Sequence, residues 1–243
     1  MPTAPVSGET VAIEGPDGKF DAYVARPAQG PAPGLVLMQY ICGVNAVMRR
    51  LADGFASHGY LVACPDLFWR QEPGVQLIQD PSKPDPAEQQ RALDLNAGFD
   101  DAAATADLNA TIDWLRGSPD CTGRAGALGY CLGGRLAFLT AARSDADCSV
   151  GYYGVNIDRY LGEAGTIASP LMLHIAGADE LCSQEAHDAI VGTLDPLDAV
   201  TLHEYEGAGH AFALEGGHNY RADAAALANT RSLAFLQQHL NGA

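Results

Sequence analysis

The segment Gly129–Gly134 (GYCLGG) has the residue types of a nucleophile elbow, a sharp turn that presents one reactive side chain between a strand and a helix. A short apolar run (125–128) precedes it and a helical pattern (135–142) follows it. The flanking glycines keep the turn free of side chains that would collide with it. The helix N-terminus favours a thiolate at Cys131 through the partial positive charge of its N–H groups. The motif predicts that Cys131 is a nucleophile; a buried structural cysteine is the alternative.

A cysteine nucleophile works with a base and with a group that orients the base. His210, in Gly-Ala-Gly-His-Ala-Phe, and Asp179, in Gly-Ala-Asp, both follow Cys131 in the chain. Nucleophile, acid and histidine in this order are typical of α/β-hydrolases. We therefore predict that His210 is the base and that Asp179 fixes the tautomer and orientation of its imidazole. Glu180 and Asp195 are rival candidates for the orienting acid.

Acyl transfer creates a negatively charged oxygen that requires hydrogen-bond donors. The backbone N–H of Leu132, directly after the nucleophile, and that of Ile41, in the loop after the first core strand (35–38), are the predicted donors. Cys42, next to Ile41, could lie near Cys131 and form a sulfur bridge on oxidation. A buried apolar role is the simpler interpretation of Cys42.

Strands and helices alternate from residue 35 onward, which predicts a mostly parallel sheet with helices on both faces. Two earlier strands, joined by the turn 15–18, predict an N-terminal β-hairpin. Sites in such sheets lie beyond the carboxyl ends of the strands, where the three proposed catalytic residues fall. The loop 65–86, rich in proline and aromatic residues, has the length of a functional or mobile segment. The expected strands are 10–13, 20–25, 35–38, 61–64, 125–128, 149–153, 171–175 and 200–205, and the expected helices end near 57 or span 87–97, 101–116, 135–142, 184–193 and 222–239.

The composition narrows the class of protein. A chain of 243 residues with 47% hydrophobic and 18% charged residues predicts one globular domain over residues 1–243. The net charge of −16 argues against nucleic-acid partners and anionic membrane surfaces. The start of the chain does not resemble a signal peptide, and no apolar run is long enough to span a membrane, which predicts a cytoplasmic protein. The six cysteines and seven histidines lack metal-site spacing, so no metal site is expected.

Several segments, taken together, resemble the dienelactone hydrolase family. They are the elbow itself, Gly-Val-Asn at 43–45, Cys-Pro-Asp-Leu at 64–67, Gly-Tyr-Tyr-Gly-Val at 151–155, Gly-His-Ala-Phe at 209–212 and Ala-Ala-Leu-Ala-Asn at 225–229. The resemblance covers nearly the whole chain. It implies an α/β-hydrolase domain without a large cap domain, and a monomer that needs no cofactor. It also implies the triad Cys131, Asp179 and His210, with Ile41 and Leu132 as oxyanion donors.

The sequence departs from the family pattern at positions that bind substrate. Members that act on dienelactone carry a glutamate where this chain has Tyr40, and that glutamate helps to activate the cysteine. They also carry a carboxylate-binding arginine where this chain has Leu214. The position of their second carboxylate-binding arginine corresponds to about Gln89 of this chain, and Arg91 lies two residues further on. Each lost charge-assisted bond is worth about 1.5–3 kcal/mol, so an anionic lactone should bind less well here.

These departures predict a pocket for neutral esters or lactones. The side chains expected to line it are Tyr40, Trp69, Phe212 and Leu214, with Arg91 as a further substrate-binding candidate. The predicted reaction is hydrolysis of a small-molecule ester or lactone through an acyl-enzyme. The alternative is a catalytically weak member that senses redox state through its thiol. Carbon–halogen hydrolysis is disfavoured, because it normally uses a carboxylate nucleophile at the elbow.

Overall fold

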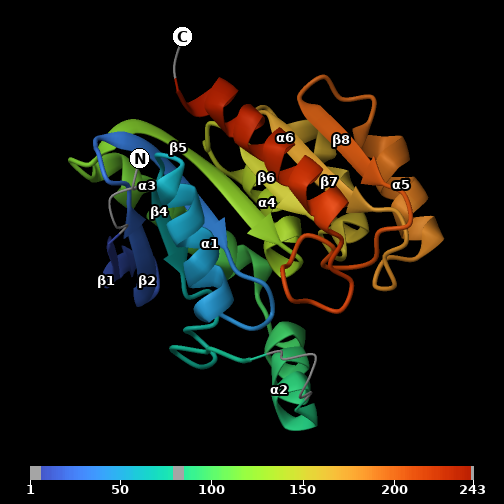
Figure 1. The fold of residues 1–243 in the computed structure, drawn as a ribbon, viewed down its shortest axis with the longest axis horizontal. Helices are drawn as coiled ribbons and strands as arrows, with labels where there is room; N and C mark the ends of the chain where they lie inside the picture. The colour runs from blue at the N-terminus through green and yellow to red at the C-terminus, as the bar shows by residue number, and fades with distance from the viewer. Residues whose placement is uncertain (1–6, 79–84, 242–243) are drawn as a thin grey trace.

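The computed structural model describes residues 7–78 and 85–241, whose strands form one eight-stranded sheet (Figure 1). The strands lie in the order β1-β2-β4-β3-β5-β6-β7-β8. β1 and β2 form an antiparallel hairpin that joins β4 antiparallel, and the neighbours from β4 to β8 are all parallel. This confirms the predicted α/β-hydrolase architecture with an N-terminal hairpin. The bounds are β1 Ser7–Gly15, β2 Gly18–Arg26, β3 Ala32–Met38, β4 Leu61–Pro65, β5 Cys121–Tyr130, β6 Ser149–Tyr152, β7 Leu171–Ala176 and β8 Val200–Tyr205.

Helices cover both faces of the sheet. One face carries α1 (Ala46–Ser57) and α6 (Ala222–Leu240), and the other carries α3 (Asp101–Gly117) and α4 (Leu132–Arg143) (Figure 1). α5 (Gln184–Leu194) packs beside β8 and the 3-10 helix η1 (Ile157–Thr166), whereas α2 (Pro86–Ala97) projects away from the sheet. No large cap domain is present in the described part of the chain. None of its helices is long and apolar enough to cross a membrane.

The burial of the strands explains which of them could be predicted from apolar runs in the sequence. Every residue of β3, β4 and β6 is buried, as expected of parallel strands covered on both faces, and these strands read as apolar runs. In β5 the last six residues are buried but the first four are exposed or half-buried. The apolar pattern therefore predicted only the buried part of β5.

Other bounds also differ from the prediction. Both hairpin strands are longer than expected, because their pairing continues to Gly15 opposite Gly18. Helix α4 begins at Leu132, three residues earlier than predicted from apolar periodicity, since glycines occupy its first turn. The 3-10 helix η1 was not predicted. Residues 79–84 of the predicted loop 65–86 lie outside the described residues.

Candidate active site

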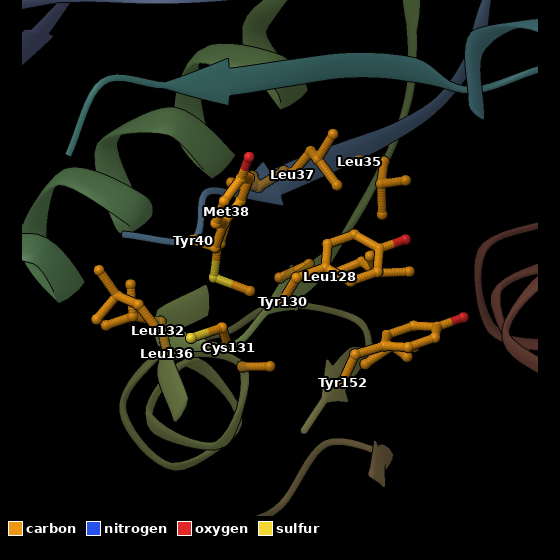
Figure 2. Close-up of a cluster of buried hydrophobic side chains, with 14 of the residues drawn as sticks. Leu35, Leu37, Met38, Tyr40, Leu128, Tyr130, Cys131, Leu132, Leu136 and Tyr152 are labelled. Atoms are coloured by element: carbon orange, nitrogen blue, oxygen red, sulfur yellow. The ribbon is translucent and has the colours of Figure 1, made fainter. Parts of the chain in front are cut away.

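The nucleophile elbow is the junction of β5 and α4. Cys131 has φ 57 and ψ −110, a backbone conformation that non-glycine residues rarely adopt and that is often found at functional sites. Its N–H donates to the carbonyl of Tyr152 at 3.0 Å, and its carbonyl accepts from the N–H of Gly134 at 2.9 Å. Figure 2 shows the cysteine side chain at this junction, on the side that faces Met38 and Tyr40. Backbone bonds to β6 and to α4 thus fix the strained turn.

The glycines of the elbow are required by close backbone approach. A Cβ atom on Gly129 would lie 2.3 Å from the carbonyl oxygen of Gly133, and one on Gly133 would lie 2.4 Å from that of Met38. Both distances are far inside normal contact, so the predicted collision is confirmed. The same packing brings the loop after β3 against the first turn of α4.

This packing makes a stability prediction. We expect Gly129→Ala to lower the free energy of unfolding by about 1–3 kcal/mol, because backbone rather than a flexible side chain must move. Gly192→Ala in α5 is the matched control, since its Cβ would meet nothing within 4 Å. Alanine there should raise stability by up to about 1 kcal/mol through helix propensity. Urea unfolding measures both variants, and an unchanged value for Gly129→Ala would contradict the packing.

Asp179 and His210 lie in the loops after β7 and β8 and are hydrogen-bonded to each other. Nδ1 of His210 lies 2.9 Å from Oδ2 and 3.1 Å from Oδ1 of Asp179. Oδ1 also accepts the backbone N–H of Leu181 at 2.9 Å, which fixes the carboxylate. Both side chains are largely buried, so water competes little with this bond.

Opposing effects act on the pKa of His210. Burial is the largest and lowers it, whereas hydrogen bonds to Asp179 and Cys131, together with their charges, raise it more, from 6.5 to about 10. Asp179 and Cys131 both act on His210, so the three predicted triad residues lie close together. The imidazole is therefore held as an imidazolium at neutral pH beside the cysteine sulfur.

The raised pKa of His210 has a consequence for stability. Because the folded pKa lies above the unfolded one, the imidazolium stabilises the fold fully below about pH 6.5, and this contribution is lost as the pH rises through about 10. We expect the stability difference between wild type and His210→Gln to shrink across that range in urea unfolding. Replacement of the exposed His58 by Gln is the control. A difference that stays constant or grows would contradict the assignment.

The rival acids lie elsewhere. Glu180 accepts the backbone N–H of His210 at Oε2, at 3.0 Å, rather than the imidazole. Asp195 is exposed at the end of α5. Among these carboxylates, Asp179 alone has a hydrogen bond to the imidazole in the described part of the chain.

The two predicted oxyanion donors come from two different segments. Leu132 is the first residue of α4, and Ile41 lies in the turn after β3. Within residues 7–78 and 85–241, neither backbone N–H donates to a protein acceptor. Helix N-termini leave such N–H groups unpaired, which suits them to bind a negative oxygen.

The family follows from comparison with known proteins. The sequence model of the dienelactone hydrolase family matches residues 20–240. The chain belongs to the dienelactone hydrolase family. A carboxymethylenebutenolidase of Pseudomonas putida is 41% identical over 229 residues, which cover 94% of this chain and 95% of the relative. A protein of Azospirillum brasilense is 46% identical over 237 residues, which cover 93% of this chain and 96% of that one.

A solved structure confirms the fold. A chain from Klebsiella pneumoniae matches with a TM-score of 0.81 at 24% identity, over 97% of this chain and 100% of that chain. The family membership, with relatives of more than 40% identity over nearly the whole chain, makes this protein a hydrolase that acts on ester or lactone bonds.

Trp69 and Arg91, two of the predicted substrate-binding residues, make their contacts away from the triad. Trp69 donates from Nε1 to Asp107 at 2.8 Å and stacks on Phe20 with ring centroids 6.0 Å apart. Arg91, on α2, is paired with Glu72 and is about half exposed, with 49% of its side chain accessible. Their partners belong to the hairpin, to α3 and to the loop after β4. The large ring of Trp69 fills a small apolar cluster under the hairpin.

Phe212 and Leu214 follow His210 in the chain but differ in burial. Phe212 is fully buried, with its ring 5.4 Å from that of Tyr153 and 4.7 Å from that of Tyr205. Its role in the structure is therefore packing. Leu214 is half-buried in the loop after the histidine, so its side chain remains a candidate to contact substrate.

Tyr40 and Cys42 lie close to the elbow. Nδ2 of Asn45 donates to the Tyr40 hydroxyl at 2.7 Å. Burial raises the pKa of Tyr40, and the neighbouring Cys42 and Cys131 add to this rise. Burial also raises the pKa of Cys42 to about 12, with the charge of Cys131 as the next cause. Both groups are therefore neutral near pH 7, and Tyr40 cannot replace the family carboxylate.

Sequence reasoning missed one neighbour of the histidine. The ring of Tyr153 packs edge-on against the imidazole of His210, with centroids 5.2 Å apart. Tyr153 directly follows β6 and has φ 38, a positive value that a tyrosine adopts only under constraint. Its place beyond a strand end was the signal that could have identified it.

Proposed function

We propose that this protein hydrolyses small neutral esters or lactones through an acyl-enzyme on Cys131. The observation that carries the proposal is the hydrogen bond of 2.9 Å between Asp179 and Nδ1 of His210, together with the cysteine of the elbow, which lies close enough to His210 to raise its pKa. Cys131 and His210 each expose 9% of their surface, so the reacting groups are shielded from bulk water while still accessible. Membership of the dienelactone hydrolase family supports the same chemistry.

Acylation begins with attack of the Cys131 thiolate on the carbonyl carbon. A C–S bond forms, and the carbonyl oxygen becomes an oxyanion that accepts the N–H groups of Leu132 and Ile41. As the tetrahedral intermediate collapses, the C–O bond to the alcohol breaks. The imidazolium of His210 donates its proton to the departing alkoxide, which leaves a thioester on Cys131 and a neutral imidazole.

Deacylation uses the same groups in reverse. Neutral His210 takes a proton from water as the water oxygen attacks the thioester carbonyl, which again forms an oxyanion. Collapse of this intermediate breaks the C–S bond, releases the carboxylic acid and regenerates the thiolate with its imidazolium partner. Asp179 holds the proton on Nδ1, so that Nε2 faces the sulfur and the substrate.

Charge supports the preference for neutral substrates. Arg91, a candidate to bind a substrate carboxylate, is paired with Glu72, and Arg135 of the elbow helix α4 is paired with Asp101 at 3.0 Å. Leu214 stands where relatives that bind a carboxylate have an arginine. The net charge of −16 further disfavours the approach of an anion. A substrate carboxylate would therefore lose its hydration and find both arginines already paired with carboxylates.

The charge preference can be tested with two esters of the same leaving group, neutral p-nitrophenyl acetate and the anionic mono-p-nitrophenyl ester of succinate. We expect a higher kcat/KM for the neutral ester. Leu214→Arg should raise the anionic-to-neutral ratio of kcat/KM by about tenfold, the effect of one charge-assisted bond. Leu214→Met, of similar length without charge, should leave that ratio unchanged. A wild-type preference for the anion, or no response to the arginine, would refute the charge argument.

A further inference from the structure

The backbone of His210 is held from both sides. Oε2 of Glu180 accepts its N–H at 3.0 Å, and Nδ2 of Asn219 donates to its carbonyl oxygen at 3.0 Å. The same amide of Asn219 also donates to Oε1 of Glu180 at 2.8 Å. These three bonds form a closed ring, which we call the Glu180–Asn219 clamp. It joins the loops after β7 and β8 to the segment that leads into α6.

The loop that carries His210 needs such support. Gly207 and Ala211 both adopt the left-handed backbone, with φ 65 and φ 62. For alanine this conformation costs about 1–2 kcal/mol, so the surroundings must impose it. The clamp also lies directly against the loop, since a Cβ on Gly209 would come within 2.9 Å of Nδ2 of Asn219. The position of His210 is therefore set by contacts outside its own loop.

Two consecutive carboxylates each accept a hydrogen bond from His210. Asp179 binds the imidazole, whereas Glu180 binds the peptide N–H of the same residue. Burial raises the pKa of Glu180, but hydrogen bonds from His210 and Asn219 and the positive charge of His210 lower it more. The interaction is reciprocal, so the negative charge of Glu180 favours the imidazolium.

We propose that Glu180 and Asn219 are positioning residues, which hold the backbone of His210 so that its Nε2 points at Cys131. This rests on the proposed function, in which His210 transfers the proton. A histidine fixed at both its peptide and its ring has little freedom to turn away from the sulfur. Small displacements of a catalytic group cost up to about a hundredfold in rate.

The test uses Glu180→Ala, Asn219→Ala and the double variant, assayed with p-nitrophenyl acetate. Each single variant should lower kcat by about tenfold to a hundredfold with little change in KM, because the clamp orients the base and not the substrate. The double variant should resemble the worse single one, since both act as one unit. Glu215→Ala is the matched control: it removes an exposed carboxylate from the same loop that makes no hydrogen bond in the described part of the chain. It should keep the wild-type kcat.

The pH profile separates positioning from a merely structural role. Glu180→Ala should move the basic limb of the kcat/KM profile to lower pH, because it removes a charge that favours the imidazolium, whereas the neutral Asn219→Ala should leave the limb in place. Glu180→Gln keeps an oxygen that can accept the His210 N–H, so its kcat should be higher than that of Glu180→Ala. Because glutamine is neutral, the basic limb of its kcat/KM profile should still lie at lower pH than in wild type. Rates within twofold of the Glu215→Ala control, or a basic limb that none of the variants moves, would overturn the proposal. Cys131→Ala in the same assay tests the proposed function separately, because its retention of activity would refute the nucleophile whatever the clamp does.

Discussion

Replacement of Cys131 by alanine is expected to abolish ester turnover, with kcat lower by about 10,000-fold or more, as for other nucleophiles that act within a triad. Alanine keeps the elbow backbone but offers no atom that can form the acyl bond. The positive φ of Cys131 is equally available to alanine, so the variant should fold. Its kcat for p-nitrophenyl acetate, compared with that of wild type, measures the loss.

Cys42→Ala is the matched control for this loss. Cys42 is also a free, buried cysteine and lies near Cys131, but it has no role in the proposed reaction. We expect this variant to keep turnover while losing about 1 kcal/mol of stability through the small cavity. If Cys131→Ala remained active, or if Cys42→Ala were the inactive variant, the assignment of the nucleophile would be wrong.

Asp179→Asn should reduce kcat by about 10,000-fold, the size of effect expected when a triad histidine is held in the wrong tautomer. Oδ1 of Asp179 accepts the N–H of Leu181 at 2.9 Å, so the amide oxygen of asparagine would take this place. The amide NH₂ would then face Nδ1 of His210 and require it to accept a hydrogen bond. The proton would move to Nε2, where it prevents the imidazole from taking a proton from water, and the charge that supports the imidazolium would be lost.

Asp195→Asn is the control for this second variant, since Asp195 is exposed and was a rival for the same role. It should have the wild-type kcat. Steady-state rates across a pH series, with thermal unfolding to establish folding, compare the two. Equal rates in Asp179→Asn and wild type, or a loss in Asp195→Asn instead, would transfer the orienting role away from Asp179.

The sequence predicted the parts of the site that depend on local constraints. The elbow was visible because two glycines are required where backbones meet, and because the buried end of β5 is a continuous apolar run. Cys131, Asp179 and His210 were found because parallel strands bring their carboxyl ends to one edge. The three residues follow β5, β7 and β8, and these strands lie in the same order across the sheet as along the chain.

Contacts between residues that are far apart in the sequence could not be predicted. Trp69 and Arg91 have long side chains whose partners depend on tertiary packing. Trp69 is hydrogen-bonded to Asp107 and Arg91 is paired with Glu72, both away from the triad. The Glu180–Asn219 bond joins residues 39 positions apart, and neither residue belongs to a periodic pattern.

The central claim is that an acyl group is carried by Cys131. Rapid acid quench of the enzyme with p-nitrophenyl acetate, followed by intact-mass and peptide mass spectrometry, tests it most directly. We expect one acetyl group per chain, located on Cys131, with His210→Gln accumulating the adduct because deacylation lacks its base. Turnover without any acetylated cysteine, or an acetyl group on another residue, would contradict the account. Slow acetylation of Cys131 without turnover would instead favour the thiol sensor.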